Sequence, residues 1–456
     1  MKDFKLSISN SIIKKEFRAF LTLFVALMLQ MLLSLFVNLL DNFMLGRYME
    51  SAMSGASVVN QIHTLLANII FGVGSGVTML GAQYWGKGNV YAIKRLFACG
   101  LKTAFVIGLI FTIATMIFSD YILIILTNDN EVIRQGSEYL SVMCWTYLVY
   151  SISNTLMLSM QAVGTAVVGM IMSASTIIIN FCLNYLLIYG NFGAPELGIK
   201  GAAYATLISR IVELIIVILY ILFFDKKIKI RIRELFVWKT GYYRDYIKVA
   251  APIMLTGSMW GTGLAAQTAI IGHLSSQAIG ASSIAGTVSQ IFLVPSFSSC
   301  NACGVVIGKA VGCDRIDLVK PLTKILQIFL IIMGVSMGIL LFLFKGIIIS
   351  FYNVSAETTA LALQFMTVLS LTCMGSTYEY PVMGGIIAGG GNTKYQTVID
   401  MSFMWLLVIP CAAVSAFVFN WPPVVTFIFL KFDQLLKCIP NSIYCNSYKW
   451  IKNRTR

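Results

Sequence analysis

Charge is scarce in this sequence, and its scarcity excludes most classes of soluble protein. Only 11% of the 456 residues are Asp, Glu, Lys or Arg, whereas 58% are hydrophobic. Soluble globular domains carry about 25% charged residues. The broad class that fits is therefore a polytopic, all-α integral membrane protein.

Histidine and paired metal ligands are also scarce. His63 and His273 stand alone, and the C-x-x-C pair Cys300 and Cys303 has no second Cys or His pair near it. Metal sites of this kind need such a second pair. We therefore expect no cofactor, and no resident metal other than a transported ion.

A cleavable signal peptide is missing too. The opening segment MKDFKLSISNSIIKKEF is polar and basic, with no short apolar core ending in small residues. We expect the first long apolar run, which ends at Leu45, to direct membrane insertion. Asp41 lies near the end of this run. A carboxylate in hydrocarbon is costly and marks a functional site, so we predict a proton or Na⁺ site there.

Long apolar runs are abundant. About 20 apolar residues cross a bilayer as one helix, and by this measure the sequence predicts twelve transmembrane helices. The expected spans are 19–45, 54–83, 95–118, 136–162, 166–190, 198–224, 246–272, 278–308, 320–350, 358–388, 394–419 and 421–440.

The net charge of +14 follows the membrane topology. On a soluble protein it would suggest nucleic acid, but here the basic residues concentrate in alternate loops. The most basic loop is 225–245, which includes Lys226, Lys227, Lys229, Arg231, Arg233 and Arg244. Basic loops stay in the cytoplasm. We therefore expect a bacterial or archaeal cytoplasmic membrane protein with this loop and both termini inside, and no nucleic-acid partner.

The two halves of the chain repeat each other. A shift of 226 residues aligns DNFMLGRYMESAMSGAS (41–57) with QTAIIGHLSSQAIGASS (267–283), and the same shift places Gly86 on Gly312. We predict an N-terminal lobe at 1–224, a cytoplasmic linker at 225–245 and a C-terminal lobe with a short tail at 246–456. Six spans in each half make this a parallel internal repeat, as in two-lobed secondary transporters.

Several motifs spread along the chain resemble one family. They are D-x4-G (Asp41, Gly46), GAQYWGKG (81–88), NFCLNYLLIYG (180–190), APELGIKGAAYAT (194–206), GKAVG (308–312), GGGNTK (389–394) and MWLLVIP (404–410). In this order, they resemble the multidrug and toxic compound extrusion (MATE) transporters, and within them the bacterial DinF-like branch.

The resemblance implies a V-shaped, two-lobed transporter with alternating access. It implies antiport, in which a cation enters while an organic, often cationic, compound leaves. No nucleotide is implied, and the sequence lacks a G-x4-G-K-[ST] motif for ATP.

The resemblance also supplies companions for Asp41. The family's cation site adds two polar positions on the fifth span and a Thr on the sixth, here Asn180, Asn184 and Thr206. The i, i+4 spacing places both amides on one helix face, and the oxygens suit a hard cation such as Na⁺ or a proton relay. The alternative is that both amides link helices and that Asp41 faces water.

Departures from the family pattern bear on the coupling ion. Relatives often have Asp where this chain has Asn184, so the site holds one carboxylate. This favours a proton over Na⁺, because burial raises a carboxylate's affinity for protons. The seventh span has no acid, and the turn after the tenth has Asn392, so the coupling of branches with acids there does not carry over.

Four further charges lie inside spans. Arg210 and Glu213 are three residues apart and can form a structural ion pair or a relay. Glu379 and Asp400 can face the cavity and attract a cationic drug, or lie buried against Lys394 or near the interface.

Two other functions compete with drug export. One is a flippase for lipid-linked saccharides or polyprenyl lipids within the same superfamily, which tends to have a cationic cavity; here few basic residues lie within spans. The other is a membrane-embedded enzyme, for which the spans hold no paired His or Ser/His arrangement. We expect a transporter of small molecules that works as a monomer with no obligate protein partner.

Overall fold

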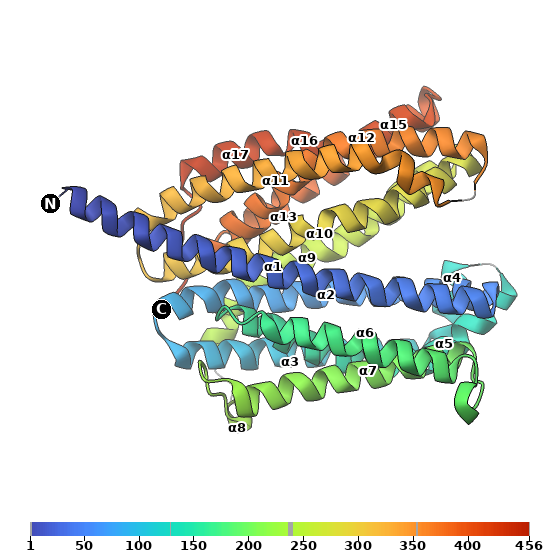
Figure 1. The fold of residues 1–456 in the computed structure, drawn as a ribbon, viewed down its shortest axis with the longest axis horizontal. Helices are drawn as coiled ribbons and strands as arrows, with labels where there is room; N and C mark the ends of the chain where they lie inside the picture. Colours follow the sequence, from blue (N-terminus) through green and yellow to red (C-terminus); the bar gives the residue numbers. More distant parts are fainter. Residues whose placement is uncertain (1, 128, 236–239, 353, 456) are drawn as a thin grey trace. The chain divides into compact units, whose positions relative to one another are not determined.

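The computed structural model describes residues 2–127, 129–235, 240–352 and 354–455, and all regular elements in these ranges are helical (Figure 1). Helices are expected because a bilayer offers no partner to backbone polar groups, which a helix satisfies internally. The chain divides into two compact units.

The N-terminal unit comprises Ala26–Gly81 and Gly88–Gly257. Within it, α5 packs against both α3 and α7, and α6 lies beside α7 (Figure 1). Its elements, whole or in part, are α1 (Lys2–Tyr48), α2 (Glu50–Gly86), α3 (Val90–Ile117), α4 (Ser119–Leu126), α5 (Asn130–Gln161), α6 (Val167–Leu187), η1 (Asn191–Gly193), α7 (Ile199–Leu219), η2 (Tyr220–Phe224), α8 (Ile232–Leu235) and α9 (Thr240–Gly272).

The C-terminal unit comprises Ser258–Arg456 together with Met1–Val25 and Ala82–Lys87. Here α12 packs against α10 and α11. The remaining elements belong to it: α10 (Ser276–Gly312), α11 (Ile316–Ser350), α12 (Ala356–Tyr380), η3 (Pro381–Ile387), α13 (Thr393–Phe403), η4 (Met404–Val408), α14 (Ile409–Ala413), η5 (Val414–Val418), α15 (Pro423–Lys431), α16 (Asp433–Leu436) and α17 (Cys438–Ser447).

Each expected span corresponds to one helix or one run of joined helices. Among the described residues, nine are long and apolar enough to cross a membrane by length and composition. The other three expected spans correspond to α5, α9 and the run α15–α17. The last run is interrupted, which a hydropathy pattern cannot show.

Proline has different effects in two of the helices. Pro252 lies inside α9, which continues through it. At Pro381, α12 gives way to the π-helix η3. Proline has no N–H and disturbs the helical hydrogen-bond ladder, and a π-turn is one way of restoring it.

The predicted linker 225–245 lies within the N-terminal unit, and its residues 236–239 fall outside the described part. Asp225 accepts hydrogen bonds from the N–H groups of the next turn, and Lys94 of α3 binds the Glu234 carboxylate at 2.8 Å. The linker is therefore structured locally and is bound to α3 by an ion pair.

Candidate ion-coupling site

The structure brings together the four residues predicted around Asp41. Asn184 donates one hydrogen bond to Asp41 and one to the Asn180 side-chain oxygen, the latter at 3.0 Å. Asn180 in turn donates to the Thr206 hydroxyl at 3.4 Å. The result is one hydrogen-bonded chain across α1, α6 and α7, which we call the Asp41 network.

The two amides of the Asp41 network are buried away from the protein surface. Asn180 is 1% exposed and Asn184 is fully buried, while Asp41 is partly buried. The side-chain oxygen of Asn184 has no hydrogen-bond partner among the described residues. Since a buried polar atom without a partner is costly, this oxygen indicates a position for a water molecule or a cation.

A second polar cluster continues along the same two helices. Arg210 Nη1 lies 2.8 Å from the Glu213 carboxylate, and Thr176 of α6 donates to Glu213 at 2.5 Å. Thr176 lies one turn from Asn180 on α6, and Arg210 lies one turn from Thr206 on α7. The predicted pair Arg210 and Glu213 therefore forms, and it extends the polar face of the Asp41 network.

An aromatic ring packs against the arginine of this ion pair. The Arg210 guanidinium lies 5.1 Å from the centre of the Tyr150 ring on α5, within cation–π range. His63 of α2 packs against the same ring, with centroids 4.7 Å apart. Nothing in the spacing of the sequence linked His63 to Arg210.

The C-terminal unit buries a different charged cluster. Lys437 lies 3.0 Å from Asp400 and 2.8 Å from Asp433, and Asn441 donates to Glu379 at 3.4 Å. Apart from Asp400, these residues are at most 7% exposed. Lys394, the basic partner considered for Asp400, is exposed instead.

Sequence reasoning missed Lys437, Asp433 and Asn441. The i, i+4 spacing of Asp433 and Lys437 inside an expected span was the available signal. Their partners Asp400 and Glu379 lie on α13 and α12, a long way off in sequence, so spacing could not connect them.

The repeat partner of Asp41 has a different environment. Gln267 accepts a hydrogen bond from Lys431 at 3.3 Å. Where the first half holds a carboxylate among amides, the second holds an amide beside a lysine. The two equivalent positions therefore differ in chemistry, because Asp41 can ionise and Gln267 cannot.

The glycine-containing motifs of the two halves also meet. A Cβ on Gly86 would overlap the backbone oxygen of Lys309, and one on Gly312 would overlap that of Gln83. The Cys313 thiol donates to the Gly86 oxygen at 2.9 Å. GAQYWGKG and GKAVG therefore provide a close backbone contact within the C-terminal unit.

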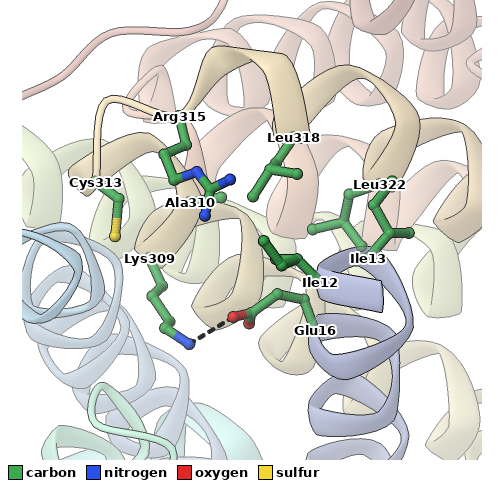
Figure 2. Close-up of a pocket in the computed structure, with 9 residues that line it drawn as sticks. All are labelled: Ile12, Ile13, Glu16, Lys309, Ala310, Cys313, Arg315, Leu318 and Leu322. Carbon is green, nitrogen blue, oxygen red and sulfur yellow. Dashed lines mark hydrogen bonds and ion pairs between the residues drawn. The ribbon is translucent and has the colours of Figure 1, made fainter. Parts of the chain in front are cut away.

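A small hollow adjoins this contact (Figure 2). Its lining includes the ion pair between Lys309 and Glu16 at 2.8 Å, drawn as a dashed line in the figure. The hollow has room for about 60 Å³, well below the roughly 300–1,000 Å³ of small-molecule sites. Its lining is Ile12, Ile13, Glu16, Lys309, Ala310, Cys313, Arg315, Leu318 and Leu322.

A family model, MatE, matches the chain twice, at residues 26–186 and 252–414. The chain belongs to the MatE family. The two matches begin at the 226-residue offset found in the sequence, and this confirms the predicted internal repeat. The resemblance to MATE transporters is confirmed with it, whereas the DinF-like branch stays a prediction.

Curated relatives cover most of the chain. A probable multidrug resistance protein NorM from Thermotoga maritima is 25% identical over 421 residues, which are 92% of this chain and 90% of that protein. A probable multidrug resistance protein YoeA from Bacillus subtilis is 24% identical over 405 residues, 86% of this chain and 85% of that protein. This MatE chain is accordingly a multi-pass membrane transporter and not an enzyme.

Solved structures confirm the twelve-helix, two-lobed fold. An outward-facing multidrug resistance MATE family transporter superposes with a TM-score of 0.85 at 16% identity, covering 94% of this chain and 95% of that one. A MOP superfamily transporter from Pyrococcus furiosus, whose reverse binding-pocket polarity suggests a different function, superposes with 0.86 at 15% identity and the same coverage. The fold alone therefore does not determine which compound is transported.

Proposed function

We propose that this chain is a secondary active antiporter that exports organic, often cationic, compounds in exchange for protons, with Na⁺ as the alternative ion. Asp41 carries the coupling ion. The observation that supports this role is the hydrogen-bonded chain from Asp41 through Asn184 and Asn180 to Thr206. A lone carboxylate in contact with an amide that has a free oxygen can take up and release one positive charge.

The direction of transport follows from the topology that we propose. The distribution of basic residues supports an orientation with both termini and the segment 225–245 in the cytoplasm of a bacterial or archaeal cell. The protein works as a monomer without a cofactor. The coupling ion binds Asp41 from outside, either as a proton or as Na⁺, and neutralises its charge. The neutralised site permits the transporter to return to its inward-facing state without the exported compound, and the ion is then released inside.

Uptake of a fluorescent cationic dye into everted vesicles, which corresponds to export from the cell, tests this function. Wild type and Asp41→Asn are each assayed under an imposed proton gradient and, separately, an imposed Na⁺ gradient. Asp41→Asn should lower the rate of gradient-driven transport at least tenfold. Asp317→Asn serves as control because its carboxylate lies in the first turn of α11 and is 69% exposed. Equal transport by wild type and Asp41→Asn would contradict the role of Asp41.

The flippase alternative is less well supported by the charges of the described residues. An anionic lipid headgroup needs accessible basic groups, but the buried Lys437 is held by Asp400 and Asp433, and Lys431 binds Gln267. Failure of dye transport under both gradients, with export of a labelled polyprenyl-phosphate lipid instead, would favour the flippase.

A further inference from the structure

The last residues of the chain form a strap across one end of the C-terminal unit. Trp450 anchors this strap, because the residue is fully buried and a Cβ on Gly390 would overlap its ring. Two residues later, the Lys452 N–H donates a hydrogen bond to the Gly390 carbonyl at 2.7 Å. We call residues 450–454 the C-terminal strap.

The C-terminal strap also holds the last turn of α2 through the side chain of Gln83. The amide nitrogen of Gln83 donates to the carbonyls of Gly389 at 3.0 Å and Lys452 at 3.4 Å. Its amide oxygen accepts from the Arg454 N–H at 2.9 Å. Gln83 is 1% exposed, and a buried amide without partners is costly. The position of this turn of α2 therefore depends on that of the strap.

Helix α2 is shared by the two units. Its residues up to Gly81 belong to the N-terminal unit, whereas Ala82–Lys87 belong to the C-terminal unit. The strap thus binds the one turn of α2 that groups with the C-terminal unit. In the proposed orientation the end of α2, the turn at 389–391 and the C-terminus all face the cytoplasm, since each follows an even number of expected spans.

We propose that the C-terminal strap is a cytoplasmic latch of the transporter. A closed latch keeps the last turn of α2 on the C-terminal unit. An open latch releases this turn to move with the rest of α2, and the inward-facing state then forms. This inference rests on the proposed alternating access, in which the two lobes part on the cytoplasmic side to admit the exported compound. It adds a device that sets how often the transporter is open to the cytoplasm.

The internal repeat supports a holding role for the strap. The 226-residue shift places Gln83 on Lys309, and Lys309 forms an ion pair with Glu16 at 2.8 Å. The chain therefore binds both equivalent positions with a terminal segment, one with its C-terminus and the other with its N-terminus. Both segments lie outside the family matches at 26–186 and 252–414.

Opening of the strap exposes little apolar surface. Residues 451–455 have no regular secondary structure, and the side chains of Lys452, Asn453 and Arg454 are polar and already exposed. Asn453 donates to Asp314, and Arg454 Nε donates to the Gly391 carbonyl at 3.0 Å. When such bonds break, water replaces the lost partners, so each bond contributes little net stability. The strap can therefore open and close while the helices stay folded.

Truncation of the strap tests the proposal. A chain that ends at Ile451 loses the bonds from Lys452 and Arg454 to Gln83 but keeps the Trp450 anchor. A chain that ends at Arg454 keeps these bonds and is the matched control. Gln83→Leu removes the same bonds from the other side while retaining a side chain of similar size.

Hydrogen exchange and transport are both measured. Ending the chain at Ile451 should speed exchange of peptides that cover 82–88 roughly threefold or more, because this turn then opens more often. It should also lower the KM for dye uptake into everted vesicles roughly threefold, because an apparent dissociation constant falls as the fraction of binding-competent molecules rises. Gln83→Leu should change both quantities in the same direction, and the chain that ends at Arg454 should match wild type.

An unchanged KM in the chain that ends at Ile451 or in Gln83→Leu overturns the latch. A lower maximal rate with unchanged KM overturns it as well, because this pattern means less active protein and no shift between states. Each variant decides by itself, so misfolding of one leaves the other as the test.

Unchanged exchange at 82–88 also contradicts the latch, and this measurement needs no transport. Failure of the proposed function is distinguishable from these results. It appears as dye uptake by wild type that does not depend on Asp41, while exchange at 82–88 still responds to the truncation.

Discussion

Gly86 and Gly312 occupy reciprocal positions, each against a backbone carbonyl of the helix that carries the other. Gly86 meets Lys309, Gly312 meets Gln83, and the 226-residue repeat relates both glycines and both carbonyl residues. The contact is therefore symmetric with respect to the duplication. It explains why glycine recurs at this position of both halves.

Alanine at either glycine should disrupt this contact. The added methyl group would overlap a backbone oxygen, which cannot move aside as a side chain can, and overpacking of this kind costs about 1–3 kcal/mol. Gly86→Ala and Gly312→Ala should each lower the unfolding temperature and the yield of monodisperse protein in detergent.

Gly286→Ala is the control for this prediction. Gly286 lies on α10 like Gly312, but no described heavy atom lies within 4 Å of its Cβ position. Alanine there should be neutral, or stabilising by up to about 1 kcal/mol through helix propensity. Equal destabilisation by Gly286→Ala and Gly312→Ala would show that the close approach is not responsible.

Asn184→Ala should uncouple export while the fold remains. Asn184 donates to both Asp41 and Asn180, so its removal breaks the chain at its middle. We expect gradient-driven dye export to fall at least tenfold, and the unfolding temperature to fall by a few degrees because two buried hydrogen bonds are lost. Asn191→Ala, at the exposed hydrogen bond to the Tyr185 carbonyl, should leave export unchanged. Similar losses in both variants would contradict a specific role for Asn184.

Lys437→Met should destabilise the protein strongly. It leaves the buried Asp433 and the partly buried Asp400 without their cation, and breaking a buried pair on one side costs about 3–5 kcal/mol. The unfolding temperature should fall by several degrees, whereas Lys449→Met, at an exposed position, should change it little. Adding Asp433→Leu to Lys437→Met should recover part of the loss. Absence of any recovery would show that charge is not the cause.

The contact between α3 and α8 should depend on pH only in acid. Hydrogen bonds from the Arg231 N–H and from Lys94 hold the pKa of Glu234 below its usual range. A lowered pKa in the folded state means that the contact is intact above the ordinary value, near 4.3, and is lost as pH falls through the lowered one.

Hydrogen exchange of peptides from 226–235 measures this dependence. After correction for intrinsic rates, protection should be constant from pH 8 to about 5, and Glu234→Gln should lower it at neutral pH. The change should be modest because ion pairs that are still partly open to water contribute little. Glu357→Gln, in the first turn of α12, is the control and should leave these peptides unchanged. A gradual loss of protection between pH 8 and 6 would point to another group.

Hydropathy was sufficient for the positions of the helices, because a bilayer leaves a helix as the simplest way to satisfy the backbone. The meeting of Asp41 with Asn184 could be anticipated from the family pattern, and that of Arg210 with Glu213 from helical spacing. The cluster around Lys437 could not, because its members come from α12, α13, α16 and α17. The π-turn at Pro381 depends on how the chain compensates for a missing N–H, and no local pattern specifies that.

The Asp41 network and its arginine draw on α1, α6 and α7 of one unit, all encoded before residue 214. The residues that we propose for ion coupling are therefore all inherited with the first half of the gene. A recombination event that replaced the second half would leave these residues unchanged. In a duplicated transporter, the second half can then diverge without altering the coupling chemistry.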